Sequence, residues 1–418
     1  MNLKLEIINV KDAQFGENTT IRSGILHISR HELQELLQQD KRFSKVDIEI
    51  ARPGESCRVV RIFDVIEPRC KLGGTGENFP GELGKIKTVG EGRTRVLRGA
   101  SVVTVNLKES SDYATQTSQE VIEMSGAAAD MGFYGKLQNV VLVCRPADGV
   151  ATIDYHNALK LAGLRTAVYL AEATAGNQAD EIENYDIGPL ARAEKGLEHL
   201  PRIAYIYQVR SLQSVLEIPA HDGCFYGDNM KKILPTIVHP NEILDGAIIK
   251  GYRNMGQETY TVQNHPVVLG LYGKHGKELC FAGVVITVAT YTEPERERFA
   301  AITSKLVKWV LGADGVILTK IGGGAPHVDL GQTLEQCEKL GVKTAAIVNQ
   351  EALIFNTPLA NAIVNTGRPS QTTLPAVKKV IGGPMNYGGK PAEGEIKVSD
   401  FNGTASQIGA SKFTMREV

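Results

Sequence analysis

The sequence predicts an α/β protein with two mostly parallel-sheet halves plus a small N-terminal α+β module, for three reasons. Apolar runs typical of buried strands alternate with helical stretches from residue 138 to 209 and again from 315 to 349. Such alternation is typical of a parallel sheet covered by helices on both faces. Before residue 66, short strand-like runs surround a single capped helix. The chain of 418 residues is long enough for about two or three domains, which we place at 1–95, 96–223 and 224–418.

The N-terminal module is predicted from period-two patterns and one helix signal. Strands are expected at 3–10, 21–28, about 46–51 and 58–65. Ser29 precedes a helical stretch that runs to Leu37, and Glu32 follows Ser29 three residues later, which is a capping-box pattern. Residues 71–95 are rich in glycine and predict a long loop. Because no glycine is followed directly by a Lys-Ser or Lys-Thr pair, as it is in a P-loop, an ordered covering loop is favoured over a phosphate-binding loop.

The two halves are predicted from longer apolar patterns. The first half is expected to contain a strand at 139–144, a helix at 151–162, a strand at 165–171, a helix near 189–198 and a strand at 202–209. The second half is expected to begin with strands at 245–250, 266–272 and 279–289 and a helix at 293–311, with Pro294 at an early position. A strand at 315–321, a helix at 330–340 and a strand at 343–349 form another β-α-β unit. A glycine-rich segment at 382–389 precedes a tail, 390–418, that is expected to be mobile or docked on a partner.

Composition excludes several classes of protein. Hydrophobic residues make up 42% of the chain and charged residues 22%, which is ordinary for a folded globular protein, and a net charge of -1 indicates no broad basic surface for nucleic acid. No apolar run reaches the roughly 18 residues of a membrane helix, and the first residues lack the apolar core of a signal peptide. Neither the cysteines nor the histidines have the spacing of a metal site. A reducing cytoplasm is therefore the simplest setting for the scattered cysteines, which are Cys57, Cys70, Cys144, Cys224, Cys280 and Cys337.

The first candidate site is the stretch Pro219-Ala-His-Asp-Gly-Cys-Phe-Tyr-Gly-Asp-Asn229. Its glycines and Asx residues indicate a turn around Cys224. The thiolate of Cys224 can attack the carbonyl group of Gly223, because glycine tolerates the distorted backbone that this attack requires. β-Elimination from the resulting thioester would break the chain and leave dehydroalanine, which hydrolyses to a pyruvoyl group. His221 would shuttle the proton and Asp222 would orient His221. The simpler interpretation, which spacing alone favours, is a buried and inert thiol.

The second candidate site is the predicted loop from Gly322 to Asp329. It lies between a strand and a helix, at the edge where α/β sheets bind ligands. The backbone N–H groups of Gly322, Gly323 and Gly324 suit a carboxylate or a phosphate. His327 and Asp329 would add proton transfer or a polar contact. The alternative is a glycine-rich turn with a surface histidine, and the dinucleotide fingerprint G-x-G-x-x-G is absent.

Four segments are specific as a set, although none is specific alone: Val10-Lys-Asp-Ala-Gln-Phe-Gly16, Asp64-Val-Ile-Glu-Pro-Arg69, Cys224-Phe-Tyr-Gly-Asp-Asn229 and Thr319-Lys-Ile-Gly-Gly-Gly-Ala-Pro-His-Val-Asp329. Together they make the chain resemble the precursor subunit of the substrate-specific component, protein B, of the glycine, sarcosine and betaine reductases. The chain is also similar to the pyruvoyl-bearing precursor of D-proline reductase. The resemblance covers nearly the whole chain.

The resemblance implies that the precursor is cleaved before Cys224 and that this cysteine becomes an N-terminal pyruvoyl group. It implies no metal or nucleotide cofactor. The expected partners are a selenocysteine-containing subunit of component B and a small selenoprotein carrier, in a hetero-oligomer. The C–N bond of a small amino acid such as glycine would be broken, the carboxymethyl group would pass to the selenoprotein, and a third component would release acetyl phosphate. In this scheme the Gly322–Gly324 amides would hold the substrate carboxylate and His327 would move a proton.

The chemistry also limits the substrate. A pyruvoyl carbonyl condenses with a primary or secondary amine, so glycine and sarcosine qualify. Betaine is a quaternary ammonium and would instead need an aromatic cage, for which Tyr226 and Phe225 are available.

Two other hypotheses stay open. The residue before the cysteine is usually asparagine or threonine in the family and is Gly223 here, which favours an uncleaved scaffold subunit that only docks the selenoprotein. The other hypothesis is a thiol enzyme with Cys224 as the nucleophile and His221, or a distant histidine, as the base.

Overall fold

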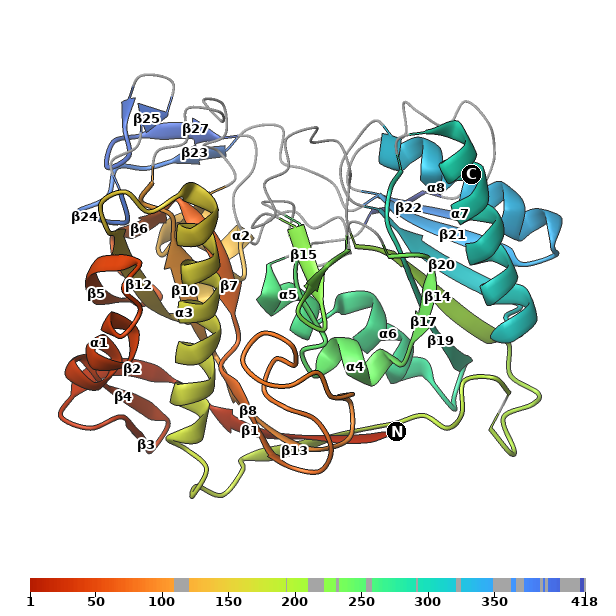
Figure 1. Ribbon diagram of the computed structural model, residues 1–418, viewed down its shortest axis with the longest axis horizontal. Helices are drawn as coiled ribbons and strands as arrows, with labels where there is room; N and C mark the ends of the chain where they lie inside the picture. The colour runs from red at the N-terminus through yellow and green to blue at the C-terminus, as the bar shows by residue number, and fades with distance from the viewer. Residues whose placement is uncertain are drawn as a thin grey trace.

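The structure is a computed structural model. It describes residues 1–108, 120–192, 194–209, 222–230, 233–252, 258–290, 292–320, 325–348, 362–365, 372–383, 386–387, 390–398 and 414–416. The fold is a mixed α/β fold, and the prediction of the α/β class is confirmed. In Figure 1 the N-terminal sheets lie on the left and a seven-stranded sheet lies on the right, with strand β15 (Asp222–Phe225) between them.

The N-terminal sheets are assembled from strands that are far apart in the sequence. Two of them have four strands each. The first has the order β13 (Glu181–Asp186), β1 (Asn2–Asn9), β9 (Gly92–Arg98) and β8 (Arg69–Gly73). The second has the order β5 (Phe43–Ala51), β12 (Gln138–Pro146), β10 (Ala100–Val105) and β7 (Ile62–Ile66). Because β5 pairs with β12, the predicted first module and the start of the predicted second domain share one sheet. The domain boundaries, including the boundary at residue 223, stay predictions.

A three-stranded sheet and one helix complete the predicted N-terminal module. The sheet contains β2 (Asp12–Gly16), β4 (Ile25–Ser29) and β3 (Thr20–Arg22). The expected strand at 21–28 is divided by a turn, because Ser23 and Gly24 have positive φ angles of 52° and 80°. Helix α1 (Arg30–Gln38) begins where it was predicted, and the Ser29 side chain accepts a hydrogen bond from the Glu32 amide.

Helix α3 (Thr152–Glu172) overturns the predicted strand at 165–171. The preceding helix was predicted to end at residue 162. Instead α3 continues past Gly163 and packs on β7 and β10. A Cβ atom at Gly163 would lie 2.7 Å from Ile66 Cδ1, so this glycine permits close contact between helix and sheet. The prediction of a mostly parallel sheet in the first half is also wrong. Strand β12 pairs antiparallel with β5 and parallel with β10.

The seven-stranded sheet combines strand β14 (Arg202–Gln208) of the predicted domain 96–223 with strands of the predicted domain 224–418. Its order is β17 (Thr236–Val238), β19 (Cys280–Thr287), β14, β20 (Gly315–Thr319), β21 (Lys343–Val348), β22 (Ala362–Asn365) and β28 (Thr414–Arg416). The central pairs are parallel, and the two edge strands are antiparallel. Helices α7 (Glu293–Lys305) and α8 (Ala325–Lys339) pack together on one face, and α6 (Pro266–Lys274) lies on the other (Figure 1).

Three further predictions in these regions are wrong. Residues 266–272 form helix α6 instead of a strand, because Pro266 occupies the first turn and the buried Val267, Val268 and Leu271 share one face of a helix. The expected helix near 189–198 is a series of turns in the described residues, with Gly196 at a φ of 91°. The expected strand at 58–65 is two strands, β6 (Cys57–Val60) and β7, which Arg61 separates with a φ of 60°.

The C-terminal segment returns to the N-terminal sheets. Strand β24 (Lys379–Ile381) pairs with β6, on whose other side β11 (Val121–Glu123) lies. Two short antiparallel pairs lie in the same segment: β23 (Thr372–Leu374) with β27 (Ile396–Val398), and β25 (Asn386–Tyr387) with β26 (Lys390–Pro391). The remaining described helical elements are α2 (Gly126–Met131), the 3₁₀ turn at Tyr134–Lys136, α4 (Pro240–Leu244), α5 (Thr259–Gln263) and the π-helical turn at Leu306–Val310 that follows α7. None of the described helices combines the length and the apolar character that crossing a lipid bilayer requires.

Candidate functional site

Cys224 lies on a short β-hairpin in the middle of the molecule (Figure 1). Strand β15 (Asp222–Phe225) pairs antiparallel with β16 (Asp228–Asn229) and with β18 (Ile248–Tyr252). Tyr226 and Gly227 connect the hairpin, with φ angles of 50° and 83°. Two consecutive residues with positive φ are typical of the tight turns that join neighbouring antiparallel strands. The predicted turn is therefore present at Tyr226 and Gly227, whereas Gly223 and Cys224, which were expected in the turn, belong to strand β15.

The strand pairing is irregular at the bond that the sequence singles out. Asp222 is opposite Tyr252, whereas Cys224 is opposite Ile249, so the register of β15 against β18 shifts by one residue at Gly223. Gly223 itself is buried. Such irregularities frequently lie beside active sites, where they change the direction of a side chain or of a carbonyl group. The described residues thus place the Gly223–Cys224 bond at a distorted point of the sheet.

The thiol of Cys224 has both apolar and charged neighbours. Its side chain is 7% exposed and belongs to the apolar cluster that includes Phe79 and Ile249. The ammonium group of Lys160, on α3, lies 3.8 Å from the sulfur atom and 2.8 Å from Oε1 of Glu82. Sequence analysis did not identify Lys160 or Glu82. The only sequence signal for Lys160 was its position as the single charged residue in the apolar stretch 158–164.

The glycine-rich loop at 74–91 packs directly on this hairpin. A Cβ atom at Gly81 would lie 2.1 Å from the carbonyl oxygen of Tyr226, and a Cβ atom at Gly227 would lie 2.4 Å from the Gly81 backbone. Only glycine permits two main chains to approach this closely. The loop is also where Glu82 originates. The prediction of an ordered covering loop is confirmed for this segment.

A buried carboxylate holds both ends of this loop in place. Asp245, after α4, accepts hydrogen bonds from Lys71 Nζ at 2.7 Å, from the Gly90 amide at 2.7 Å and from Thr94 Oγ1 at 2.6 Å. Lys71 precedes the loop, Gly90 lies near its end and Thr94 is on the following strand β9. The cover over the Cys224 hairpin is therefore attached at both ends to the same side chain.

The other predicted residues of the first site are placed as follows. Tyr226 donates a hydrogen bond to Glu242 Oε2 at 2.6 Å and accepts one from the Val89 amide at 3.3 Å. Burial, and next the bond to Glu242, raise the pKa of Tyr226, and burial also raises the pKa of Glu242. Asp222 begins β15, and His221 lies outside the described residues. A substrate contact for Tyr226 stays a prediction.

The second predicted site is partly helical. Its glycines, Gly322, Gly323 and Gly324, lie outside the described residues. The expected loop to Asp329 is wrong, because α8 begins at Ala325 and carries both His327 and Asp329. Proline at the second position of α8 is common in first turns, so the helix starts earlier than the apolar pattern suggested.

His327 and Asp329 occupy buried positions in the first turns of α8. Burial and the positive charge of Lys320 lower the pKa of His327 to about 4, so this imidazole is neutral at pH 7. Asp329 accepts hydrogen bonds from the Thr290 amide at 2.8 Å and from Arg296 Nε at 2.6 Å. Burial raises the pKa of Asp329, whereas these two hydrogen bonds oppose the increase. These contacts connect Asp329 to α7, and its role with a ligand stays a prediction.

A buried polar cluster on the seven-stranded sheet was also missed. The Tyr205 hydroxyl lies 2.5 Å from Thr319 Oγ1 and 3.2 Å from Nε2 of His265, which precedes α6. His265 is fully buried, and burial lowers its pKa to about 3. No sequence pattern separates a buried histidine before a proline from one in a turn.

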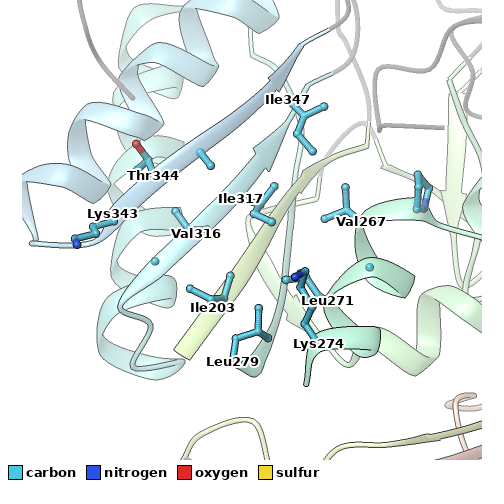
Figure 2. A pocket seen from close by; sticks show the side chains of 14 residues that line it. Ile203, Val267, Leu271, Lys274, Leu279, Val316, Ile317, Lys343, Thr344 and Ile347 are labelled. Atoms are coloured by element: carbon cyan, nitrogen blue, oxygen red, sulfur yellow. The ribbon is translucent and has the colours of Figure 1, made fainter. Parts of the chain in front are cut away.

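A cavity of about 490 Å³ lies on the same face of this sheet, beside α6 (Figure 2). Its lining is apolar except for Lys274, Lys343 and Thr344, and its centre is formed by Ile317, Leu271 and neighbouring aliphatic residues. Figure 2 shows the side chains of β20 and β21 on one side and those of α6 on the other. This lining does not suit a zwitterionic amino acid, which needs several polar partners.

Three curated relatives resemble the chain over nearly its whole length. The glycine reductase complex component B subunits alpha and beta of Acetoanaerobium sticklandii are 35% identical over 440 residues, which cover 100% of both sequences. The sarcosine reductase complex component B subunit alpha of Peptoclostridium acidaminophilum is 36% identical, over 91% of the chain and 89% of the relative. The betaine reductase complex component B subunit alpha of the same organism is 31% identical, over 91% of the chain and 88% of the relative.

A family profile gives the same result. The profile described as glycine/sarcosine/betaine reductase component B subunits matches residues 1–397. No solved structure matches the chain.

Proposed function

Since the chain belongs to the family of glycine/sarcosine/betaine reductase component B subunits and is an oxidoreductase-type subunit, we propose that it binds glycine or an N-methylated glycine and promotes reductive cleavage of the C–N bond. The carboxymethyl group of the substrate would pass to a selenocysteine. The observation that carries this proposal is the geometry around Cys224: a buried thiol, beside a cation, at an irregular point of the sheet.

The family implies a pyruvoyl group derived from Cys224, and the residues present fit that group. A pyruvoyl group supplies an electrophilic carbonyl that can condense with the amine of a substrate. The hairpin places Cys224 directly after a glycine whose strand pairing is distorted, as attack on the preceding carbonyl requires. The loop at 74–91 packs on the hairpin, and Cys224 is 7% exposed; such shielding would protect a reactive carbonyl from side reactions.

The cleavage itself would use only residues of this chain and water. The Cys224 sulfur forms a bond to the Gly223 carbonyl carbon, the peptide C–N bond breaks, and the thiol proton ends on the amine of residue 224. Loss of the Cα proton of residue 224 then breaks its Cβ–S bond and leaves a thiocarboxylate on Gly223. Water replaces the amine nitrogen, which leaves as ammonia. No oxidant or reductant takes part in these steps.

The names of two relatives support cleavage of the chain. A single sequence from Acetoanaerobium sticklandii and another from Peptoclostridium acidaminophilum are each named as subunits alpha and beta together. We propose the same division here, at Gly223–Cys224. The proposed partners are a selenocysteine-containing subunit of component B and a small selenoprotein carrier, in a cytoplasmic hetero-oligomer. Gly322, Gly323 and Gly324 are proposed to hold the substrate carboxylate, and His327 to move a proton.

An intact mass spectrum of the purified protein tests the proposal. Two fragments divided at Gly223–Cys224 are expected, and the second should lack the cysteine sulfur. Borohydride with glycine or sarcosine should add the amine to the second fragment, whereas betaine, which has no N–H, should add nothing. Cys224→Ala should remain a single chain, and Cys280→Ala, at another buried cysteine, should divide normally. A full-length mass that never divides and never traps an amine contradicts the proposal.

A non-catalytic scaffold subunit is the second candidate. The burial of Cys224 among apolar side chains favours it, because buried thiols are commonly inert. A scaffold keeps the activity of the assembled reductase in the Cys224→Ala variant, whereas the proposed function loses that activity.

A further inference from the structure

Lys160 contacts the only atom of Cys224 that can act as a nucleophile. Its ammonium nitrogen is 3.8 Å from the sulfur atom and 2.8 Å from Glu82 Oε1. The side chains of Lys160 and Glu82 are 17% and 7% exposed. They come from α3 and from the covering loop at 74–91, which are distant in sequence from Cys224. Three segments of the chain therefore converge on one sulfur atom.

This arrangement differs from an ordinary surface ion pair. Surface pairs are well hydrated and contribute little to stability. Here Lys160 lies in an apolar stretch of α3, in which Leu159, Ala162 and Leu164 are buried. Its ammonium group contacts the carboxylate of Glu82 and the thiol of Cys224. Burying a charge is costly unless partners compensate for it. A cation beside a cysteine favours the thiolate, which is the nucleophilic form.

We propose that Lys160 is a catalytic residue of chain cleavage, which stabilises the thiolate of Cys224 as it attacks Gly223, and that Glu82 positions Lys160. The inference rests on the proposed function, because Cys224 acts as a nucleophile only there. In the cleavage step Lys160 neither gains nor loses a proton. It supplies a fixed positive charge while the S–C bond forms and the peptide C–N bond breaks, and the thiol proton ends on the amine of residue 224.

Two charged side chains of the described residues lie next to each other at this sulfur atom. Lys160, on α3, contacts Cys224, and Glu82, on the loop, contacts Lys160. The strands on either side place Asn229 and Ile249 opposite Cys224, and neither side chain is charged. Glu82 holds the ammonium group in place and partly neutralises it. The two charged residues should therefore act on the thiolate in opposite directions.

The test compares pH profiles in the full-length protein. The cleavage rate is followed by intact mass spectrometry for the parent chain and for Lys160→Met, Lys160→Arg and Glu82→Gln. In Lys160→Met the midpoint of the profile should rise by about one pH unit, and the rate at pH 7 should fall about tenfold. Lys160→Arg keeps the charge and should keep most of the rate. Glu82→Gln keeps an acceptor but removes the negative charge, so its midpoint should move to lower pH.

A matched control comes from the same loop. Lys87 pairs with Glu77 at 2.5 Å, and both side chains are exposed, so Lys87→Met should leave the profile unchanged. General damage to the fold would lower the cleavage rate, but it would not move the midpoints of the Lys160→Met and Glu82→Gln profiles in opposite directions. A midpoint that stays in place in Lys160→Met overturns the inference, even where the parent chain is cleaved normally.

A second readout separates this inference from the proposed function. Where the parent chain is never cleaved, the proposed function fails, but the thiol of Cys224 is still present. The rate of its alkylation by iodoacetamide, located by peptide mass spectrometry, is then measured against pH in the same variants. Opposite shifts for Lys160→Met and Glu82→Gln support the electrostatic contact on its own, and coincident profiles refute it.

Discussion

Removal of the Asp245 carboxylate should detach the loop that covers Cys224. The side chain of Asp245 is fully buried and accepts three hydrogen bonds, from Lys71, Gly90 and Thr94, at 2.6 to 2.7 Å. These donors lie on both sides of the loop at 74–91. The single substitution Asp245→Ala should therefore remove the hydrogen bonds that hold both ends of the loop.

The expected cost follows from the groups that lose their partner. Removing one member of a buried ion pair typically destabilises a protein by about 3–5 kcal/mol. Lys71 is 10% exposed and keeps a hydrogen bond to the Glu91 carbonyl oxygen at 2.8 Å. The lower end of that range therefore applies, and we expect Asp245→Ala to reduce the free energy of unfolding by about 3 kcal/mol.

Two measurements check this expectation. Urea denaturation gives the free energy of unfolding, and the alkylation rate of Cys224 in the uncleaved chain reports on the cover. Both should change in Asp245→Ala. Glu77→Gln removes an exposed ion pair of the same loop and should cost less than about 1 kcal/mol. If the two variants have equal stability and Cys224 is alkylated equally fast in both, Asp245 does not hold the loop.

Three other substitutions test the packing and the pH dependence. Gly163→Val should destabilise the protein by about 1–3 kcal/mol in urea denaturation, because α3 cannot move away from the sheet, whereas Gly273→Ala, with open space around it, should not destabilise it. Arg58→Met breaks a fully buried pair with Glu123 and the bonds to the carbonyl groups of residues 375, 392 and 394, so hydrogen exchange at 372–383 should accelerate. Burial lowers the pKa of His265 in the folded protein to about 3. Between pH 6.5 and 3 the imidazole of His265 is therefore protonated in the unfolded chain but not in the folded one, so the free energy of unfolding falls as the pH falls. From pH 7 to pH 5 the parent should lose about 2 kcal/mol more than His265→Gln, measured by urea denaturation at both values.

The parts of the fold that the sequence predicted have local signals. Helix α1 begins at a serine cap, and α7 begins at Thr292 with a proline in its first turn. Strands β20 and β21 are short apolar runs on either side of a helix. In each of these cases the residues that decide the structure lie within a few positions of one another, so pattern and capping rules suffice.

The parts that failed depend on contacts with distant residues. Glycine disfavours a helix, and only the positions of Ile66 and Thr104 show that Gly163 allows α3 to pack closely on the sheet. Strand β13 is mostly charged and polar, and it was not predicted, because its pairing with the distant strand β1 stabilises it. Tertiary context overrides propensity in such cases.

The candidate site shows the same division. Gly223 and Cys224 could be found from their adjacency, and their turn was predicted from glycine and Asx residues. Lys160 and Glu82 are 64 and 78 positions from their respective partners, Cys224 and Lys160. No spacing rule connects residues over such separations, so only the fold could bring them to the sulfur atom.

The strand order has a consequence for a chain that is cut before Cys224. Strand β14 precedes the cut, yet it lies between β19 and β20, which both follow the cut. Strand β24 follows the cut and pairs with β6, which precedes it. The cut also divides β15, whose Asp222 pairs with Tyr252 of the second fragment. The fragments 1–223 and 224–418 would therefore share three sheets, and separating them would break the core of the seven-stranded sheet.

We accordingly expect the two fragments to remain associated after cleavage. In size-exclusion chromatography without denaturant they should elute together in equal amounts, and they should separate only in urea or guanidinium concentrations that unfold the protein. Dilution should not dissociate them, because β14 cannot leave without exposing both neighbouring strands. Cys224→Ala, as a single chain, should elute at the same position. Fragments that separate in native buffer would show that β14 is not held between β19 and β20 in the cleaved protein.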